Sequence, residues 1–493
     1  MLFDTPVYIV FLVLVVLAYW RLPPRRQNAF LLLASVVFYA WWDYRFLALL
    51  LGSALVGFAC GLLIDRSKHP RRRHAFVAAG LLVSLVTLGA FKYFNFFVDS
   101  LQSAMAPLGF ARFPRVVLQT VLPPGISFYT FQQVAYLVEV HRKTIRPSRS
   151  IVDYSLFLSL FPHLIAGPIQ RPGHLLPQVE GPRTCNHDQM VDGVMLIVTG
   201  LFRKCVIANG SAMIANAAFG GQLGPPSLPL LLLGAYSFAL QIYGDFSGYS
   251  DIARGSAKLM GFEFVLNFRQ PYLATTVQDF WRRWHISLST WLRDYLFLPL
   301  SYWLSRSMQK ERWFGIKRDL WIYGVASIGT MLIGGLWHGA SWTFLVWGGF
   351  WGVCLALERG FWSLLGPAGR RNPMRWVHPG LRSWRTWGMR LMVFHLACLA
   401  WVLFRVDSLA QAGRLLSGAL AVDWRADYGP SAIYLLVLSL PMGLLDLTME
   451  SRGWEYPVAD RGILAKMACA VILIGAIALC SAGNVSAFIY FQF

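Results

Sequence analysis

The amino-acid sequence predicts an all-α protein that crosses a membrane many times. Of its 493 residues, 56% are hydrophobic and only 14% are charged, whereas soluble domains carry about 25% charged residues. Mean hydropathy is +0.50. Apolar runs long enough to span a bilayer recur along the chain, and we expect about eleven transmembrane helices plus some re-entrant or interfacial helices.

The candidate spans follow one another with short connections. Each is an apolar run of roughly the length that crosses a membrane, about 20 residues. In order they cover residues 7–20, 28–47, 48–64, 75–97, 116–139, 153–168, 190–218, 228–246, 319–337, 341–358, 387–404, 431–448 and 463–482. Helix breakers stand beside polar side chains near the membrane at two places, residues 123–132 and 163–172. Tyr129, Gln132 and Gln170 in these segments are candidates for substrate or donor binding or for lining a tunnel.

The net charge of +20 comes mainly from short basic loops. Lys and Arg gather at residues 21–26, 66–73, 142–149, 306–318 and 370–390, as the positive-inside rule predicts. A second interpretation is that some of these groups face an anionic substrate or phospholipid headgroups. A nucleic-acid role would need a soluble basic domain, and the sequence contains none.

The first span has Asp4 before it and Arg21, Arg25 and Arg26 after it. This charge order is the opposite of a cleavable signal peptide. It predicts an external N-terminus and a cytoplasmic first loop.

The sequence contains no pattern typical of a metal site or a covalent serine enzyme. The seven cysteines and ten histidines are dispersed, and most cysteines fall in apolar runs as packing residues. The sequence has no zinc-binding histidine spacing, no Walker loop and no G-x-S-x-G elbow.

His338 is the strongest candidate for chemistry because it lies between two long apolar runs. Ionisable side chains at such positions are functional candidates by default. It could act as a general base on an acceptor hydroxyl, or be a buried imidazole bonded to a carbonyl. Its neighbours allow close backbone approach or could line a tunnel: Gly334, Gly335, Trp337, Gly339, Ser341 and Trp342.

His285 lies in residues 262–318, a stretch rich in Trp, Arg and Tyr. We expect one or two short helices there, interfacial or dipping into the protein. The imidazole could orient substrate or share a proton, and the alternative is an interfacial aromatic and basic belt. Nearby candidates for substrate or donor binding are Arg282, Arg283, Trp284, Ser287, Arg293 and Asp294.

Two acids, Asp245 and Asp251, stand at the end of an apolar run in residues 243–251. Both are candidates for substrate or donor binding or for lining a tunnel, and either could pair with an arginine of residues 282–293. The alternative is a capped turn, because Asp, Ser and Gly are turn formers.

The ordered motifs resemble the membrane-bound O-acyltransferase (MBOAT) family, in the bacterial branch of alginate O-acetyltransferases and teichoic acid D-alanyl transferases. The resemblance runs nearly end to end. It is carried by residues 91–96 (FKYFNF), 123–132 (PPGISFYTFQ), 161–169 (FPHLIAGPI), 243–251 (YGDFSGYSD), 284–285 (WH), 336–339 (LWHG), 404–409 (FRVDSL) and 488–493 (FIYFQF).

The resemblance implies one integral-membrane domain over residues 1–493, with tilted helices around a central tunnel and a catalytic core at about 90–360. The family's two histidines correspond to His338 and His285. Acetyl-CoA would be the cytosolic donor, with no bound cofactor. The acceptor would be an exported polysaccharide such as alginate, acetylated directly or through a periplasmic partner with a serine-esterase-like (SGNH-like) fold. The location would be the bacterial inner membrane.

Three alternatives remain open at this point. Within the family, the acceptor could be peptidoglycan, cellulose or teichoic acid, with D-alanyl transfer in the last case. Outside it, the chain could be a transporter or flippase, or a scaffold of an export complex. Direct attack of a hydroxyl on the thioester and a covalent acyl intermediate are both open.

Overall fold

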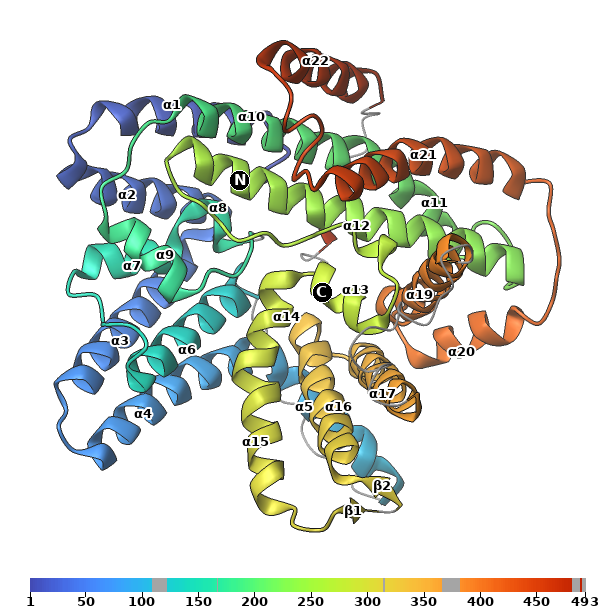
Figure 1. Ribbon diagram of the computed structural model, residues 1–493, viewed down its shortest axis with the longest axis horizontal. Coiled ribbons are helices and arrows are strands. Elements are labelled where there is room, and N and C mark those ends of the chain that lie inside the picture. Colours follow the sequence, from blue (N-terminus) through green and yellow to red (C-terminus); the bar gives the residue numbers. More distant parts are fainter. Residues whose placement is uncertain (109–121, 166, 314, 366–381, 481–487, 490–493) are drawn as a thin grey trace. The chain divides into compact units, whose positions relative to one another are not determined.

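The computed structural model describes residues 1–108, 122–165, 167–313, 315–365, 382–480 and 488–489. These residues are helical nearly throughout, and their only strands form the hairpin β1 (Arg312–Trp313) and β2 (Ile316–Lys317) (Figure 1). The all-α prediction is therefore confirmed. The chain divides into two compact units, one of Met1–Val198 with Tyr249–Val265, the other of Thr199–Gly248 with Leu266–Phe493.

The first unit contains the N-terminal helices. Prolines begin α1, α2 and α4, where their fixed backbone angle suits the first helical turn. The elements are α1 (Pro6–Arg21), α2 (Pro24–Asp43), η1 (Tyr44–Phe46), α3 (Leu47–Arg66), α4 (Pro70–Leu88), η2 (Gly89–Tyr93), α5 (Phe94–Met105), η3 (Ala106–Leu108), α6 (Ile126–Arg142), α7 (Ile151–Ser159), α8 (Phe161–Leu164), α9 (Pro172–Glu180) and most of α10 (His187–Phe202).

A buried amide ties three helices of the first unit together. Gln133 of α6 is fully buried. Its oxygen accepts from Ser53 of α3 at 2.9 Å, and its nitrogen donates to Ser84 of α4 at 2.9 Å. Such bonds between apolar helices fix their mutual packing, since the alternative is an unsatisfied polar group in an apolar setting.

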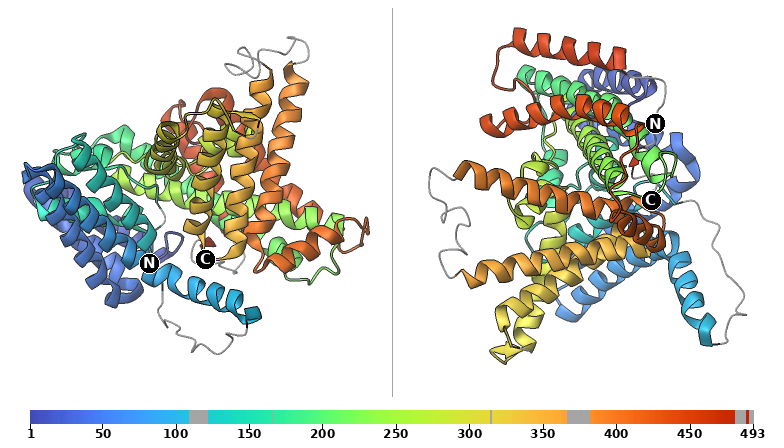
Figure 2. Two further views of the ribbon diagram at one scale, coloured as in Figure 1. Left: turned by 90° about the horizontal axis from the view of Figure 1, so that it is seen from below. Right: turned by 90° about the vertical axis from the view of Figure 1, so that its right-hand side faces the viewer.

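The second unit contains the C-terminal helices together with both candidate histidines. Figure 2 shows α16 and α17 side by side in two further views. The elements are η4 (Arg203–Ala208), α11 (Asn209–Phe219), α12 (Leu228–Leu259, whose end belongs to the first unit), η5 (Pro271–Leu273), α13 (Val277–Arg283), α14 (Ile286–Leu292), η6 (Arg293–Phe297), α15 (Leu298–Ser307), α16 (Arg318–His338), α17 (Trp342–Leu364), α19 (Arg382–Arg405), α20 (Leu409–Gly418), α21 (Tyr428–Arg452) and α22 (Ile463–Cys480).

Within the described ranges, six helical segments are long and apolar enough to cross a membrane. The protein is thus a multi-pass membrane protein, but the expected count of eleven spans is not confirmed. The segments are Pro24–Arg66, Pro70–Leu108, Arg318–His338, Trp384–Arg405, Tyr428–Arg452 and Ile463–Cys480. The first two each join two α-helices through short 3₁₀ or π turns.

Several predicted spans have other lengths in the structure. Residues 153–168 were expected to form one span, yet α7 ends at Ser159 and α8 restarts at Phe161. Pro162 lacks the N–H that a continuing helix would need, so it lies in the first turn of a new one. The predicted spans 116–139 and 463–482, the basic cluster 370–390 and the terminal motif 488–493 lie partly outside the described residues.

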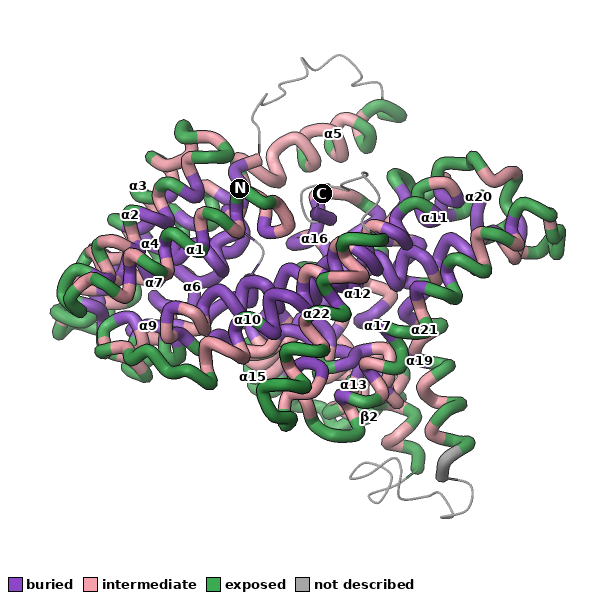
Figure 3. Tube along the Cα trace, turned by 90° about the horizontal axis from the view of Figure 1, so that it is seen from above, coloured by how far each residue is buried: buried purple, intermediate pink, exposed green. Residues whose placement is uncertain are grey.

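Helix α12 is longer than predicted and overturns the capped-turn interpretation of residues 243–251. Those residues lie inside a continuous 32-residue helix, and Figure 3 shows it as one of the most buried elements. Gly244 and Gly248 serve close helix packing: a Cβ would lie 3.0 Å from the carbonyl oxygen of Arg203 at the first and 2.6 Å from that of Gly200 at the second. Small residues at this spacing let helix backbones approach.

Candidate functional site

His338 lies at the tip of a tight helical hairpin. Helix α16 ends at His338, and Ser341 caps α17 by accepting from the Thr343 amide at 3.1 Å. A Cβ on Gly335 would collide with the carbonyl of Phe344. The backbones of α16 and α17 are therefore in direct contact, which fixes the position of the His338 backbone. Ser341, predicted to line a tunnel, is a helix cap.

His285 lies at the elbow between α13 and α14. Its backbone is left-handed, with φ 44° and ψ 53°, a conformation that costs energy for a residue with a Cβ and persists where neighbours enforce it. Asn267 supplies that restraint: its carbonyl accepts from the Ile286 amide at 2.9 Å, and its side-chain oxygen accepts from the Ser287 hydroxyl at 2.9 Å. Ser287 thus anchors the elbow.

The hairpin and the elbow bring the two imidazoles together. The ring centroids of His285 and His338 lie 6.2 Å apart, with the rings inclined at 60°. Phe246 of α12 packs edge-on against His285 at 4.5 Å. On the other side, Trp347 and Phe404 lie 5.0 and 5.4 Å from His338. The pair is enclosed by aromatic rings, with His285 0% and His338 4% exposed.

Acidic side chains clamp both ends of α13, which carries the elbow. Glu358 of α17 accepts from the amides of Val277 and Gln278 at 2.7 and 2.9 Å, at the N-terminus of the helix. Negative charge is stabilising at that end. Neither this role of Glu358 nor the acid at the other end was foreseen from sequence, because nothing in the pattern links residues so far apart.

At the C-terminal end of α13, Arg283 donates two bonds of 2.9 Å to the carboxylate of Glu450 on α21. A third bond of 2.9 Å goes to Asp279. Burial alone would lower the pKa of Arg283, but these hydrogen bonds overcome it and raise the pKa above its ordinary value. The guanidinium of Arg283 thus ties the end of α13 to α21, and the expectation that Arg283 binds substrate stays a prediction.

A cavity of about 290 Å³ lies beside the elbow. Its polar lining comes from α13, α14, η6 and α16: Gln278, Arg282, Ser289, Thr290, Arg293, Tyr323, Ser327 and Thr330. Arg293 also pairs with Asp294 at 2.8 Å. The last three lining residues share one face of α16 with His338, since side chains three or four positions apart align along a helix.

Leu292 separates this cavity from His338. It lines the cavity, and a Cβ on Gly334 would lie 3.0 Å from its terminal methyl. Leu292 therefore covers the face of α16 at the turn before His338.

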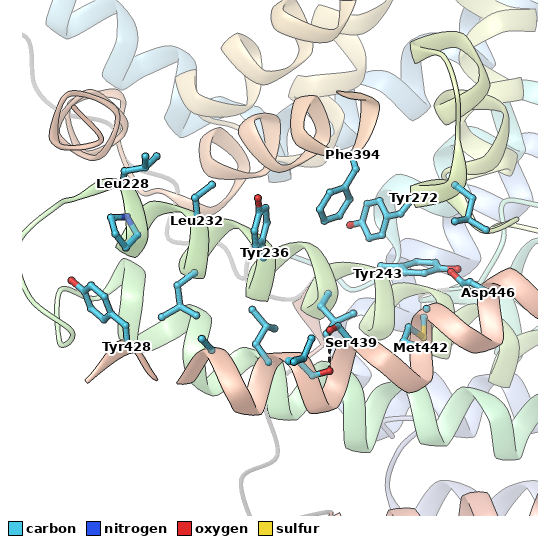
Figure 4. Close-up of a pocket in the computed structure, with 18 of the residues that line it drawn as sticks. Leu228, Leu232, Tyr236, Tyr243, Tyr272, Phe394, Tyr428, Ser439, Met442 and Asp446 are labelled. Atoms are coloured by element: carbon cyan, nitrogen blue, oxygen red, sulfur yellow. Dashed lines mark hydrogen bonds between the residues drawn. The ribbon is translucent and has the colours of Figure 1, made fainter. Parts of the chain in front are cut away.

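A second, apolar cavity of about 610 Å³ lies between α12, α19 and α21. Figure 4 shows Tyr243, Tyr272 and Asp446 at one end of it and Leu228 and Tyr428 at the other. The rings of Tyr243 and Tyr272 each lie 6.2 Å from Trp284. Trp284, predicted as a substrate contact, is 1% exposed and forms a wall behind the elbow.

A third cavity, of about 830 Å³, lies beside α22. The side chains of His285 and His338 line none of these three cavities. The expected tunnel that reaches His338 from both sides therefore stays a prediction. Trp337, one of its expected walls, is 3% exposed and packs 5.8 Å from His285.

The remaining candidates fall into two groups. Tyr129, Gln132, Gln170 and Asp251 are buried in the first unit. There the Gln132 amide contacts the His163 ring at 3.2 Å. Asp245 belongs to the second unit, and the expectation that it pairs with an arginine of residues 282–293 is wrong: its partner is Lys204 at 2.8 Å. The described residues include no group of three or more His, Cys, Asp or Glu that could hold a metal ion.

The fold and this site define a polytopic membrane protein with two facing imidazoles held in an aromatic enclosure. Residues 115–406 match the model of MBOAT, the membrane-bound O-acyltransferase family. The chain belongs to this family and is an O-acyltransferase.

Curated relatives agree with this assignment. The chain is 34% identical to the probable alginate O-acetylase AlgI of Azotobacter vinelandii, over the whole of both chains. It is 38% identical to the protein of the same name from Pseudomonas aeruginosa, over 84% of this chain and 74% of the relative. It is 32% identical to the peptidoglycan O-acetyltransferase of Helicobacter pylori, over 86% of this chain and 80% of the relative.

Proposed function

We propose that this enzyme transfers an acetyl group from cytosolic acetyl-CoA to a hydroxyl of an exported polysaccharide, with His338 as the general base. The pairing of His285 and His338 at 6.2 Å carries the proposal, because it sets two groups able to exchange protons side by side. Alginate is the first candidate acceptor, since relatives named as alginate O-acetylases match up to the full length of the chain.

The reaction needs a base more than it needs a covalent intermediate. A thioester carbonyl is a good electrophile, but a hydroxyl attacks it poorly until a base removes its proton. His338 takes that proton while the new ester bond forms and the C–S bond breaks. The departing thiolate, whose thiol has a pKa near 8.5, then takes the proton to give free CoA. His285 donates a hydrogen bond to the carbonyl oxygen, where negative charge develops.

The 290 Å³ cavity is the proposed site of the donor's thioester arm. Its size is near the lower limit of small-molecule sites, about 300 Å³, so it suits an arm and leaves the nucleotide outside. Arg282 and Arg293 supply charge for the phosphates. The cavity lies along the middle of α16, from Tyr323 to Met331. That helix follows the basic loop at 306–318, and such loops face the cytosol.

The proposal also covers the location of the enzyme and its partner, which the charge order of the first span and the family resemblance support. The enzyme lies in the inner membrane with an external N-terminus. A periplasmic partner with an SGNH-like fold receives the acetyl group or presents the polymer. Peptidoglycan is the second candidate acceptor, because the relative from Helicobacter pylori carries that name and matches 86% of this chain.

The test is acetyl transfer from labelled acetyl-CoA by membranes that contain the enzyme and its partner, with alginate and peptidoglycan offered separately. His338→Ala is expected to lower the rate at least about 100-fold, in line with the loss of a general base. His395→Ala is the matched control, because His395 is an exposed histidine on α19. Transfer that survives His338→Ala contradicts the proposal that His338 is the general base.

A further inference from the structure

We propose that Phe488 and Ile489 are positioning residues of this enzyme, which hold the imidazole of His285 in place through Asp245 and Phe246 of α12. The inference rests on the proposed function, because it assumes that the placement of His285 matters for acyl transfer. It assigns a role to the terminal motif, which the chemistry described above does not use.

Asp245 connects this segment to the core of the second unit. One carboxylate oxygen accepts from the backbone amide of Ile489 at 2.7 Å, and the other lies 2.8 Å from the ammonium group of Lys204. The side chains of Lys204 and Asp245 are 0% and 2% exposed. Breaking a buried pair of this kind leaves an uncompensated charge, so the carboxylate is held strongly in place.

The backbone around Lys204 is shaped to make this contact. Lys204 lies in η4, a π-helical turn, and such turns gather at functional sites. Gly244, next to Asp245, lets α12 approach the carbonyl of Arg203 closely. Lys204, on a π-helical turn, therefore reaches Asp245 of α12. The contact is possible because Gly244, the residue before Asp245, has no side chain.

Phe246 passes the restraint to His285. It follows Asp245 directly in α12, so fixing one residue restricts the other. Its ring centroid lies 6.2 Å from that of Phe488 and 4.5 Å from that of His285. Phe488 and Ile489 are both 0% exposed. The segment thus contributes a ring packed near Phe246 and an amide that donates to Asp245, and both restrain the part of α12 that contacts the imidazole.

A positioning role predicts a loss in turnover and not in donor binding. A misplacement of about 1 Å can cost about 100-fold in rate. We expect Phe488→Ala to lower kcat about 10-fold or more, with KM for acetyl-CoA changed less than about 3-fold. Phe488→Tyr keeps the ring and should restore most of the turnover. Phe361→Ala, which removes an exposed ring on α17, is the control for loss of an aromatic side chain.

A second measurement does not depend on transfer activity. The rate at which diethyl pyrocarbonate modifies His285, followed by mass spectrometry on the full-length protein, should rise in Phe488→Ala and stay at the wild-type rate in Phe361→Ala. If Phe488→Ala does not yield folded protein, Phe488→Leu is measured in the same way.

Unchanged kcat and unchanged His285 modification in the Phe488 variants would overturn the inference, and so would equal loss in Phe488→Tyr and Phe488→Ala. Failure of the proposed function gives a different result. In that case His338→Ala transfers normally, while faster modification of His285 in Phe488→Ala still supports the contact described here.

Discussion

The rings of His285 and His338 lie 6.2 Å apart although they belong to an elbow and a hairpin with unrelated sequences. Asn267 sets the elbow, and touching backbones set the hairpin. The geometry of the site therefore depends on residues that do not face it. Four substitutions test the contacts that hold the two imidazoles and the cavity beside them.

Close packing of α16 on α17 should be required for activity. Gly335→Ala places a methyl group against the carbonyl of Phe344, and relieving the clash must move the tip that carries His338. Overpacking of this kind costs about 1–3 kcal/mol. We expect a lower melting temperature in detergent and at least about a 10-fold loss of transfer. Gly360→Ala is the matched control, because nothing lies within 4 Å of its new Cβ. Equal melting temperatures for the two variants would contradict the packing argument.

The ion pair of Arg283 with Glu450 should stabilise the elbow without taking part in chemistry. Arg283→Ala leaves Glu450 without two hydrogen bonds, and losses of about 1–3 kcal/mol are typical for such groups. Thermal unfolding and kinetics are the measurements. We expect a lower melting temperature and a lower kcat, partly restored by the exchange Arg283→Glu with Glu450→Arg. If Arg283→Ala instead raises only KM for acetyl-CoA, then Arg283 binds the donor after all.

Arg282 and Arg293 should act on donor binding. Both line the cavity beside the elbow, and an arginine–phosphate contact is made equally in the ground and transition states. Arg293→Ala is expected to raise KM for acetyl-CoA about 10-fold while kcat changes little. Dephospho-CoA thioesters should lose less from the substitution if the arginine binds the removed phosphate. Arg312→Ala is the control, because Arg312 lies in β1 and outside the cavity lining. If KM for acetyl-CoA rises equally in the Arg312 variant, the effect is one of overall charge and Arg293 does not bind the donor.

Leu292 should control access from the cavity to His338. Leu292→Trp adds bulk where the side chain already lies against Gly334. It should reduce transfer about 10-fold or more by misplacing the reacting groups. Leu292→Ala should keep transfer and increase hydrolysis of acetyl-CoA, because water gains access to the thioester. Leu357→Trp and Leu357→Ala are the controls, because Leu357 of α17 is 68% exposed. Both should leave the rates of transfer and of acetyl-CoA hydrolysis unchanged. Normal transfer in Leu292→Trp would show that the donor uses another route.

The sequence was sufficient for the fold class. It also singled out the two imidazoles that the structure brings together, and their roles in chemistry stay predictions. Hydropathy alone predicted a polytopic helical protein, because burial in a bilayer requires long apolar runs and internally satisfied backbones. The short helices around His285 were also predicted. One or two were expected, and the structure has three: α13 and α14 meet at the elbow, and η6 joins α14 to α15.

The partners of the charged residues could not be predicted in the same way. Glu358 and Glu450 hold α13 from two distant helices, and Lys204 rather than an arginine meets Asp245. Such pairs are set by tertiary packing, which leaves no periodic signal. The capped-turn alternative for residues 243–251 failed for a related reason: the glycines there serve helix contact, and composition does not distinguish that role from a turn.

The central claim is that His338 acts as a base on a donor that arrives from the cytosol. Inside-out membrane vesicles present that face, and sealed right-side-out vesicles do not. With labelled acetyl-CoA added outside, the account predicts acetylation of polymer or partner only in inside-out vesicles, and a fall of about 100-fold or more in His338→Ala. Undiminished acetylation by His338→Ala, or equal labelling from both vesicle orientations, would contradict it.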